Sequence, residues 1–286
     1  METIQNKSES RTFLKLKTTT WYWIVAILIT IFSMIYQKIT GPTYSKKVKT
    51  VLNNKVYKFK LIRSWGGSED CKLKFNVPDK SIEGSVFYKK YKVDTNWAEV
   101  KMQRKGDVLF ALLPHQPPAG KLSYYIKFKT NTEENYLQKD EPVIIRFKGA
   151  VPKEILIPHI IFMILTMLFS SVAAIYAIFR HNKYRLIGYT AYAFLIIGGL
   201  ILGPIVQKYA FNELWAGIPF GWDLTDNKTL IAFIAWTIAI ILDYKKKRPF
   251  AFVLATIVVF LIFSIPHSVM GSEYNYEKGT IEQSDL

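Results

Sequence analysis

The sequence is poor in cysteine and lacks the signature motifs of common enzymes. Cys71 is the single cysteine among 286 residues. A disulfide framework and a CxxC metal or redox module each need at least two thiols, so the chain alone forms neither. The sequence also contains no Walker loop and no GxGxxG, HExxH, GxSxG or CxxCH motif. The enzyme and haem-attachment classes that these motifs identify are therefore unsupported.

Acidic residues are also scarce. The chain has 22 Asp and Glu against 38 Lys and Arg, a formal net charge of +16 at pH 7. Such an excess can mark a nucleic-acid-binding protein, so its distribution matters. Residues 38–153 hold 24 Lys and Arg against 11 Asp and Glu, and elsewhere basic residues form short clusters beside long apolar runs. This pattern is typical of membrane topology. We therefore predict the lipid bilayer as a partner, and no nucleic acid.

Long apolar runs, in contrast, are abundant, and 50% of the residues are hydrophobic. A helix needs roughly 17 to 25 residues to cross about 30 Å of hydrocarbon. We predict five membrane helices, over residues 21–37, 154–179, 186–206, 227–243 and 249–267. The fourth is the weakest because its apolar stretch is too short unless the preceding few residues extend it. The last four helices form a membrane domain over 154–267.

The ends of these helices alternate in charge. Basic residues cluster in 1–20, 180–185 and 245–248, whereas the loop 208–228 is mixed and the C-terminal tail is acidic. Basic residues in short loops mark the cytoplasmic side of a membrane. We therefore predict five crossings of a bacterial cytoplasmic membrane, with 1–20 as a cytoplasmic tail and 268–286 as an extracytoplasmic tail.

Residues 38–153 are predicted to form an extracytoplasmic β domain. Apolar and polar residues alternate in 71–77 and in 122–129, the period of a half-buried strand. Further predicted strands are 56–62, 85–91, 97–102, 108–113 and 143–147. About seven short strands separated by Gly and Pro turns fit an all-β, immunoglobulin-like sandwich. Lysines that alternate with apolar residues are interpreted as solvated strand faces, with a dedicated polyanion site as the alternative.

Two histidines share the same local sequence. His159 and His267 each follow an Ile-Pro pair. The predicted topology places His159 in the first turn of the second membrane helix and His267 at the end of the fifth, at similar depth. Two imidazoles so placed can ligate haem b or hold a transition-metal ion. The alternative is that these amphipathic side chains only mark helix ends.

A third histidine lies in a rigid, Pro-rich loop of the predicted β domain. If the β domain leans on the helices, His115 approaches His159 and His267. The sequence then predicts a metal site with Asp223 or Glu273 as a further ligand.

The loop between the third and fourth helices is rich in aromatic residues. Trp215, Phe220 and Trp222 stand among glycines and prolines, shortly before Asp226. Aromatic walls beside carboxylates can bind a quinone head group or a peptide. Alternatively, the aromatic residues form an interfacial belt, and Asp226 or Asn227 caps the fourth helix.

Six segments of the chain carry a resemblance. They are TGPTY (40–44), LPHQPPAGKL (113–122), RFKGAVP (146–152), GPIVQKYAF (203–211), PFGWDLTDNKT (219–229) and IPHSVMGSE (265–273). Together they resemble an uncharacterised family of bacterial multi-pass inner-membrane proteins with an extracytoplasmic β domain. The resemblance implies a bacterial inner membrane and a periplasmic domain, and it implies no activity, cofactor or catalytic residue.

Three functional hypotheses follow. The leading one is a non-enzymatic binding or assembly subunit of the bacterial envelope, whose outer surface meets another envelope protein. The second is a redox subunit that binds haem b or a metal ion through His159 and His267. The third is a membrane enzyme that uses the outer histidines and carboxylates.

Overall fold

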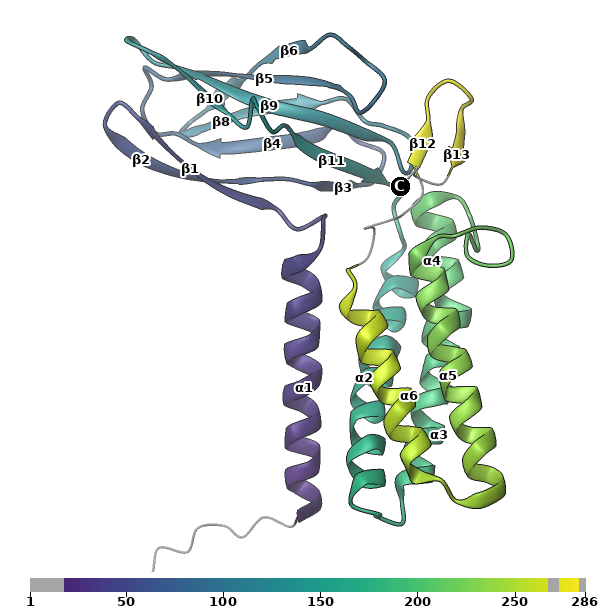
Figure 1. Ribbon diagram of the computed structural model, residues 1–286. Coiled ribbons are helices and arrows are strands. Elements are labelled where there is room, and N and C mark those ends of the chain that lie inside the picture. Colours follow the sequence, from purple (N-terminus) through teal and green to yellow (C-terminus); the bar gives the residue numbers. More distant parts are fainter. Residues whose placement is uncertain (1–17, 267–272, 283–286) are drawn as a thin grey trace, which may run out of the picture.

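A β domain lies at one end of a bundle of helices (Figure 1). The computed structural model describes residues 18–266 and 273–282. Most of the predicted cytoplasmic tail, and His267, lie outside the described residues. The first helix begins at the end of the bundle far from the β domain, and the C-terminal hairpin lies beside that domain.

The helices account for the apolar half of the chain. Their bounds are α1 Thr18–Thr40, α2 Lys153–Ile178, α3 Tyr184–Leu195, the π-helical segment η1 Ile196–Leu202, α4 Gly203–Phe211, α5 Leu224–Lys246 and α6 Pro249–Ser264. Segments α3, η1 and α4 run on without a break as one long helix, Tyr184–Phe211. This long helix, α1, α2 and α5 are long and apolar enough to cross a membrane. The fifth predicted span is shorter, because α6 has 16 residues and a helix of that length rises only about 24 Å.

Helix α5 starts earlier than the sequence predicts, and its cap is a different residue. The side chain of Asp223 accepts hydrogen bonds from the backbone N–H groups of Thr225 and Asp226. The prediction that Asp226 or Asn227 caps this helix is therefore wrong. Since both residues already lie inside the first turn, their side chains are available to hold the preceding loop.

Small side chains let the helices pack closely. Ala173, Ala191 and Ala232 are buried around Trp236 in one cluster. A side chain at Gly188 would collide with the ring of Phe252. Small residues at such contacts are the usual means of close helix packing in membranes.

The β domain contains open sheets that enclose one apolar core. Its strands are β1 Lys46–Leu52, β2 Lys55–Leu61, β3 Ser64–Gly66, β4 Cys71–Asn76, β5 Glu83–Lys90, β6 Ala98–Lys101, β7 Gln103–Lys105, β8 Val108–Leu113, β9 Lys121–Lys129, β10 Glu134–Leu137 and β11 Val143–Lys148. One sheet has the order β3-β11-β9-β5-β6, with β10 also paired to β9, and a second has the order β4-β8-β7. Strands β1 and β2 form a separate antiparallel ribbon.

Aromatic residues fill the core between these sheets. Phe59 of β2, Phe75 of β4 and Phe128 of β9 contact one another, with ring centroids 5.3 to 5.8 Å apart. Cys71 is fully buried beside them. Burial raises the pKa of its thiol to about 12, so the thiol stays protonated at neutral pH.

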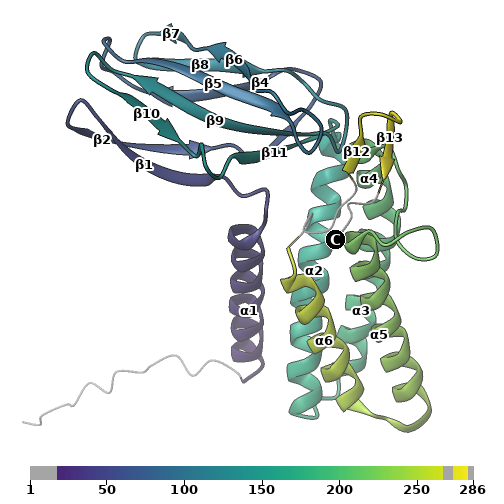
Figure 2. The same cartoon turned by 45° about the horizontal axis from the view of Figure 1, so that its top comes forward.

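Two short connections join the β domain to the helices. Residues 41–45 link α1 to β1, and residues 149–152 link β11 to α2. A third contact comes from the C-terminal segment, which the sequence suggested was a plain tail. It contains an antiparallel hairpin, β12 Glu273–Asn275 and β13 Thr280–Glu282, beside the β domain (Figure 2).

Candidate functional site at the junction of the β domain and the helices

The end of β11 lies directly against the end of α4. The backbone N–H of Gly149 donates to the carbonyl of Ala210 at 2.9 Å. A Cβ at position 149 would collide with the carbonyl oxygen of Tyr209. Glycine is therefore required for the backbones to come this close.

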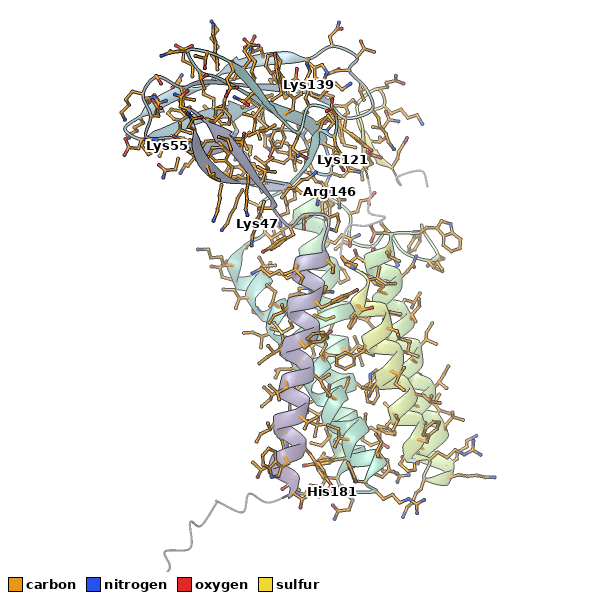
Figure 3. The ribbon with its side chains drawn as sticks, turned by 60° about the vertical axis from the view of Figure 1, so that its left-hand side comes forward. Lys47, Lys55, Lys121, Lys139, Arg146 and His181 are labelled. Atoms are coloured by element: carbon orange, nitrogen blue, oxygen red, sulfur yellow. The ribbon has the colours of Figure 1, made fainter. Side chains whose placement is uncertain are left out.

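Arg146 is buried at this contact. Its side chain is among the buried polar groups, and its guanidinium lies 4.3 Å from the centre of the Phe211 ring. Burial lowers the pKa of Arg146, and the carboxylates of Asp223 and Glu273 oppose that shift. Arg146 thus connects the β domain, α4 and the loop before α5 through packing and charge (Figure 3).

The C-terminal hairpin closes another side of the junction. Glu273 pairs with Lys121 at 3.0 Å and with Lys92 at 3.6 Å. Burial lowers the pKa of Lys121, and its hydrogen bond to Glu273 opposes this shift. The Tyr276 hydroxyl donates to the side-chain oxygen of Gln116 at 2.9 Å and accepts from the backbone N–H of Lys121 at 3.2 Å. Burial raises the pKa of Tyr276 to about 12.

The aromatic loop, residues 212–223, is held by the first turn of α5. A carboxylate oxygen of Asp226 accepts from the backbone N–H of Ala216 at 2.6 Å and from the side-chain amide of Gln207 at 2.9 Å. The side-chain oxygen of Asn227 accepts from the backbone N–H of Ile218 at 2.8 Å. The loop is therefore fixed at two points by side chains that the earlier helix start makes available.

The last helix is joined to the same cluster. The ammonium group of Lys228, whose residue is 1% exposed, donates to the carbonyl of Ile265 at 2.8 Å. Lys228 follows Asn227 in α5, so one helix turn fixes both the aromatic loop and the end of α6.

A groove runs between the aromatic loop and the C-terminal hairpin. Its volume is about 660 Å³, and it is lined by residues 213, 215, 216, 218–222, 281 and 282. Phe220 and Trp222 are 82% and 73% exposed. The indole N–H of Trp215 donates to the carbonyl of Ile218 at 3.1 Å, which fixes that ring against the loop.

Two carboxylates flank the groove. Burial, followed by the charge of Asp223, raises the pKa of Glu213. Hydrogen bonds from Asn275 and Lys278 lower the pKa of Glu282, so it stays ionised at neutral pH. The groove therefore combines exposed aromatic faces with two carboxylates, of which Glu282 is paired with Lys278 at 2.9 Å.

Two of the described histidines contact a backbone carbonyl of a neighbouring segment, whereas the ring of His181 accepts the backbone N–H of Lys183. The Nδ1 atom of His159 lies 2.8 Å from the carbonyl oxygen of Gly198, and Nε2 of His115 lies 2.9 Å from that of Gly67. The backbone N–H of His115 also donates to Asp70, within the β domain. Across 18–266 and 273–282, no three His, Cys, Asp or Glu side chains form a group that could hold a metal ion.

Some of the residues singled out from the sequence meet at this junction, and the structure adds others. Asp223, Asp226 and Glu273 all belong to it. Arg146 and Tyr276 were not foreseen. One signal in the sequence was available for Arg146, because it is a basic residue between two apolar neighbours, Ile145 and Phe147, inside a strand.

Five of the six segments that carry the resemblance contact one another here. The contacts are Phe147 N–H to Gly120 O, Gly149 N–H to Ala210 O, Gln207 to Asp226, Lys228 to Ile265 O, and Lys121 to Glu273. The sixth lies close by, since a Cβ added at Gly41 would be 3.9 Å from the side chain of Pro266. Segments that are far apart in the chain thus form one continuous structure.

Four apolar helices of membrane-spanning length, together with a β domain at one end, define a multi-pass membrane protein. Comparisons of the chain with protein-family models, with curated proteins and with solved structures gave no match.

Proposed function

We propose that this protein is a non-enzymatic binding or assembly subunit of the bacterial cytoplasmic membrane, with its N-terminus in the cytoplasm and its C-terminus outside. In this arrangement α6 is a fifth, short crossing. The basic turns at 180–185 and 245–248 support it, because both lie at the end of the bundle opposite the β domain.

We further propose that the β domain has an immunoglobulin-like topology. The order β4-β8-β7 corresponds to strands B, E and D of such a domain, and β11-β9-β5 corresponds to G, F and C. Strand β6 then takes the position of C′ beside β5. Immunoglobulin-like domains have many unrelated functions, so the binding role rests on the junction instead.

The groove beside the aromatic loop is the observation that carries the binding role. Phe220 and Trp222 are large, exposed aromatic residues on a loop that Asp226 and Asn227 hold in place. Aromatic side chains dominate the energy of protein interfaces, and those held in position before binding lose little entropy. The carboxylate of Glu213 favours a partner segment that carries a basic residue next to apolar ones, since Glu282 is already paired with Lys278.

Photo-crosslinking tests this function. A photoreactive phenylalanine at position 220 is expected to give one discrete polypeptide adduct in the membranes that natively contain the protein. The same residue at Tyr244, which is 79% exposed near the far end of α5, serves as the control and is expected to give none. Trp222→Ala is expected to weaken the association at least tenfold, and Tyr244→Ala is expected to leave it unchanged. Lipid adducts alone, or equal adducts at both positions, would contradict the proposal.

A second candidate, a redox subunit, is favoured by the hydrogen bond of His159. A carbonyl oxygen only accepts, so Nδ1 of His159 donates to it, and in the neutral imidazole Nε2 then keeps its lone pair. Metal-binding histidines usually donate their other ring N–H to such a group. The acceptor, Gly198, lies in η1, and π-helical segments are frequent at functional sites.

The absorption spectrum of the purified protein, with metal analysis, tests the second candidate. A Soret band or a stoichiometric metal ion is expected to disappear in His159→Ala and in His267→Ala. His181→Ala, at the other end of the bundle, is expected to retain it (Figure 3). A colourless, metal-free protein eliminates this candidate and leaves the crosslinking experiment unaffected.

A further inference from the structure

The β1–β2 ribbon has one apolar face and one basic face. The antiparallel register pairs Lys47 with Lys60 and Lys49 with Lys58. Since side chains alternate along a strand, these four lysines share one face, and all four are exposed. The opposite face carries Leu52, Phe59 and Leu61, which are buried in the core of the β domain.

We call the face that carries Lys47, Lys49, Lys58 and Lys60 the lysine ladder. Its two cross-strand pairs place like charges directly opposite each other, which destabilises a ribbon. By the same register, Val51 and Val56 continue this face at the tip of the ribbon, and they are 52% and 66% exposed. The ladder is thus a strip of positive charge that ends in an apolar tip.

The ladder concentrates four exposed lysines on one face of the ribbon. Some other lysines of the β domain pair with carboxylates, as Lys46 does with Glu141 and Lys127 with Glu134. Lys89 and Lys139 lie over aromatic rings. Within the part of the chain that the structure describes, none of the four ladder lysines has an ion pair or an aromatic partner of this kind.

The ladder faces the side of the β domain on which the helices lie. In Figures 1 and 2 the ribbon is the layer of the domain nearest the helices, and it extends sideways past α1. Its apolar face packs upward into the core, so its basic face points down toward the level where α1 leaves the membrane. Figure 3 shows Lys47 on this lower side.

We propose that the lysine ladder binds the anionic phospholipid headgroups of the leaflet below it, with Val51 and Val56 resting in the interface. A basic residue near an anionic membrane surface contributes about fivefold to binding, so four lysines whose effects add in free energy contribute about 600-fold. The occupant is a lipid because the ladder overhangs the bilayer that α1 crosses and is basic along its length. This proposal does not depend on the groove or on its partner.

A fluorescent reporter at the tip of the ribbon tests the proposal in the full-length protein. Val56→Cys supplies the attachment point, and the native Cys71 is fully buried and does not compete for the label. The labelled protein is reconstituted into nanodiscs that contain a headgroup-labelled quencher lipid. Nanodiscs of neutral phosphatidylcholine are compared with nanodiscs that also contain phosphatidylglycerol. Strong quenching is expected only with the anionic lipid, and 1 M salt is expected to reverse it.

Two charge-matched variants serve as controls. Replacing the four ladder lysines by Gln is expected to abolish the quenching that depends on anionic lipid. Replacing four exposed lysines on other strands by Gln, namely Lys74, Lys101, Lys105 and Lys129, is expected to leave it unchanged. Thermal unfolding checks that both variants fold. Equal quenching in neutral and anionic nanodiscs would overturn the proposal. So would an equal loss of quenching in the two variants. A response to soluble glycerophosphate in neutral nanodiscs, with none to anionic lipid, would also overturn it.

Discussion

The guanidinium of Arg146, in the last strand of the β domain, lies 4.3 Å from the centre of the Phe211 ring, at the end of α4. Three residues later the backbone of Gly149 bonds to Ala210. These contacts attach the β domain to the third span as well as to the two helices that it joins covalently.

Arg146→Met is expected to loosen the junction. The variant loses the interaction with the Phe211 ring and one of the positive charges near Asp223 and Glu273, at a cost of about 2 kcal/mol. Hydrogen exchange of the Gly149 amide is the measurement, and it should accelerate at least tenfold. Lys148→Met, at an exposed position of the same strand, is the control. An unchanged exchange rate would show that Arg146 does not secure this contact.

Gly149→Ala is expected to separate β11 from α4. The added methyl group would collide with the carbonyl oxygen of Tyr209, and neither backbone can yield cheaply. The expected loss of stability is about 1 to 3 kcal/mol, measured by thermal unfolding of the full chain. Gly66→Ala is the control, because there a methyl group meets only the flexible end of Lys148. If both variants unfold at the same temperature, the close approach of β11 to α4 does not require glycine at position 149.

Docking of the C-terminal hairpin is expected to weaken at alkaline pH. The pKa of Tyr276 is raised from 10.0 to about 12 by burial, so the folded state favours the neutral phenol. The stabilisation of the folded state by the neutral phenol is complete below pH 10 and declines as the pH rises toward 12. Unfolding temperatures measured from pH 8 to 11 should therefore fall more steeply above pH 10 in the native protein than in Tyr276→Phe. Parallel curves would exclude this tyrosine as the titrating group.

Lys228→Met is expected to release the end of α6. The substitution keeps a long apolar stem but removes the donor that bonds to the carbonyl of Ile265. Leaving this acceptor unpaired costs about 1 to 3 kcal/mol. Lower thermal stability and faster hydrogen exchange in the last turn of α6 are the expected results. The control Lys245→Met, at an exposed position at the other end of α5, should change neither the thermal stability nor the hydrogen exchange of α6.

The sequence predicts most elements of this fold because their periods are regular. Alternation in β4 and long apolar runs in α2 are local signals, and local signals can be read from one sequence. Strand β1 was missed because lysines interrupt its few apolar residues. Helix α6 ends at Ser264, sooner than predicted, because Pro266 lacks the N–H that would continue the helix.

The candidate site was less predictable because tertiary contacts create it. Trp222 and Asp226 stood out by composition, but their common role depends on where α5 begins. Tyr276 gives no local signal, since its partners, Gln116 and Lys121, lie more than 150 residues away. Contacts of this kind have no periodicity, so one sequence does not reveal them.

The two short connections at 41–45 and 149–152 have a mechanical consequence for the β domain. Five residues and four residues leave little slack, so the ends of α1 and α2 that face the β domain stay within a short reach of it. The domain therefore acts as a clamp on two helices that the lipid alone would leave free to separate. A change in the spacing of α1 and α2 would have to reorient the domain, and a ligand that reorients the domain would have to move the two helices.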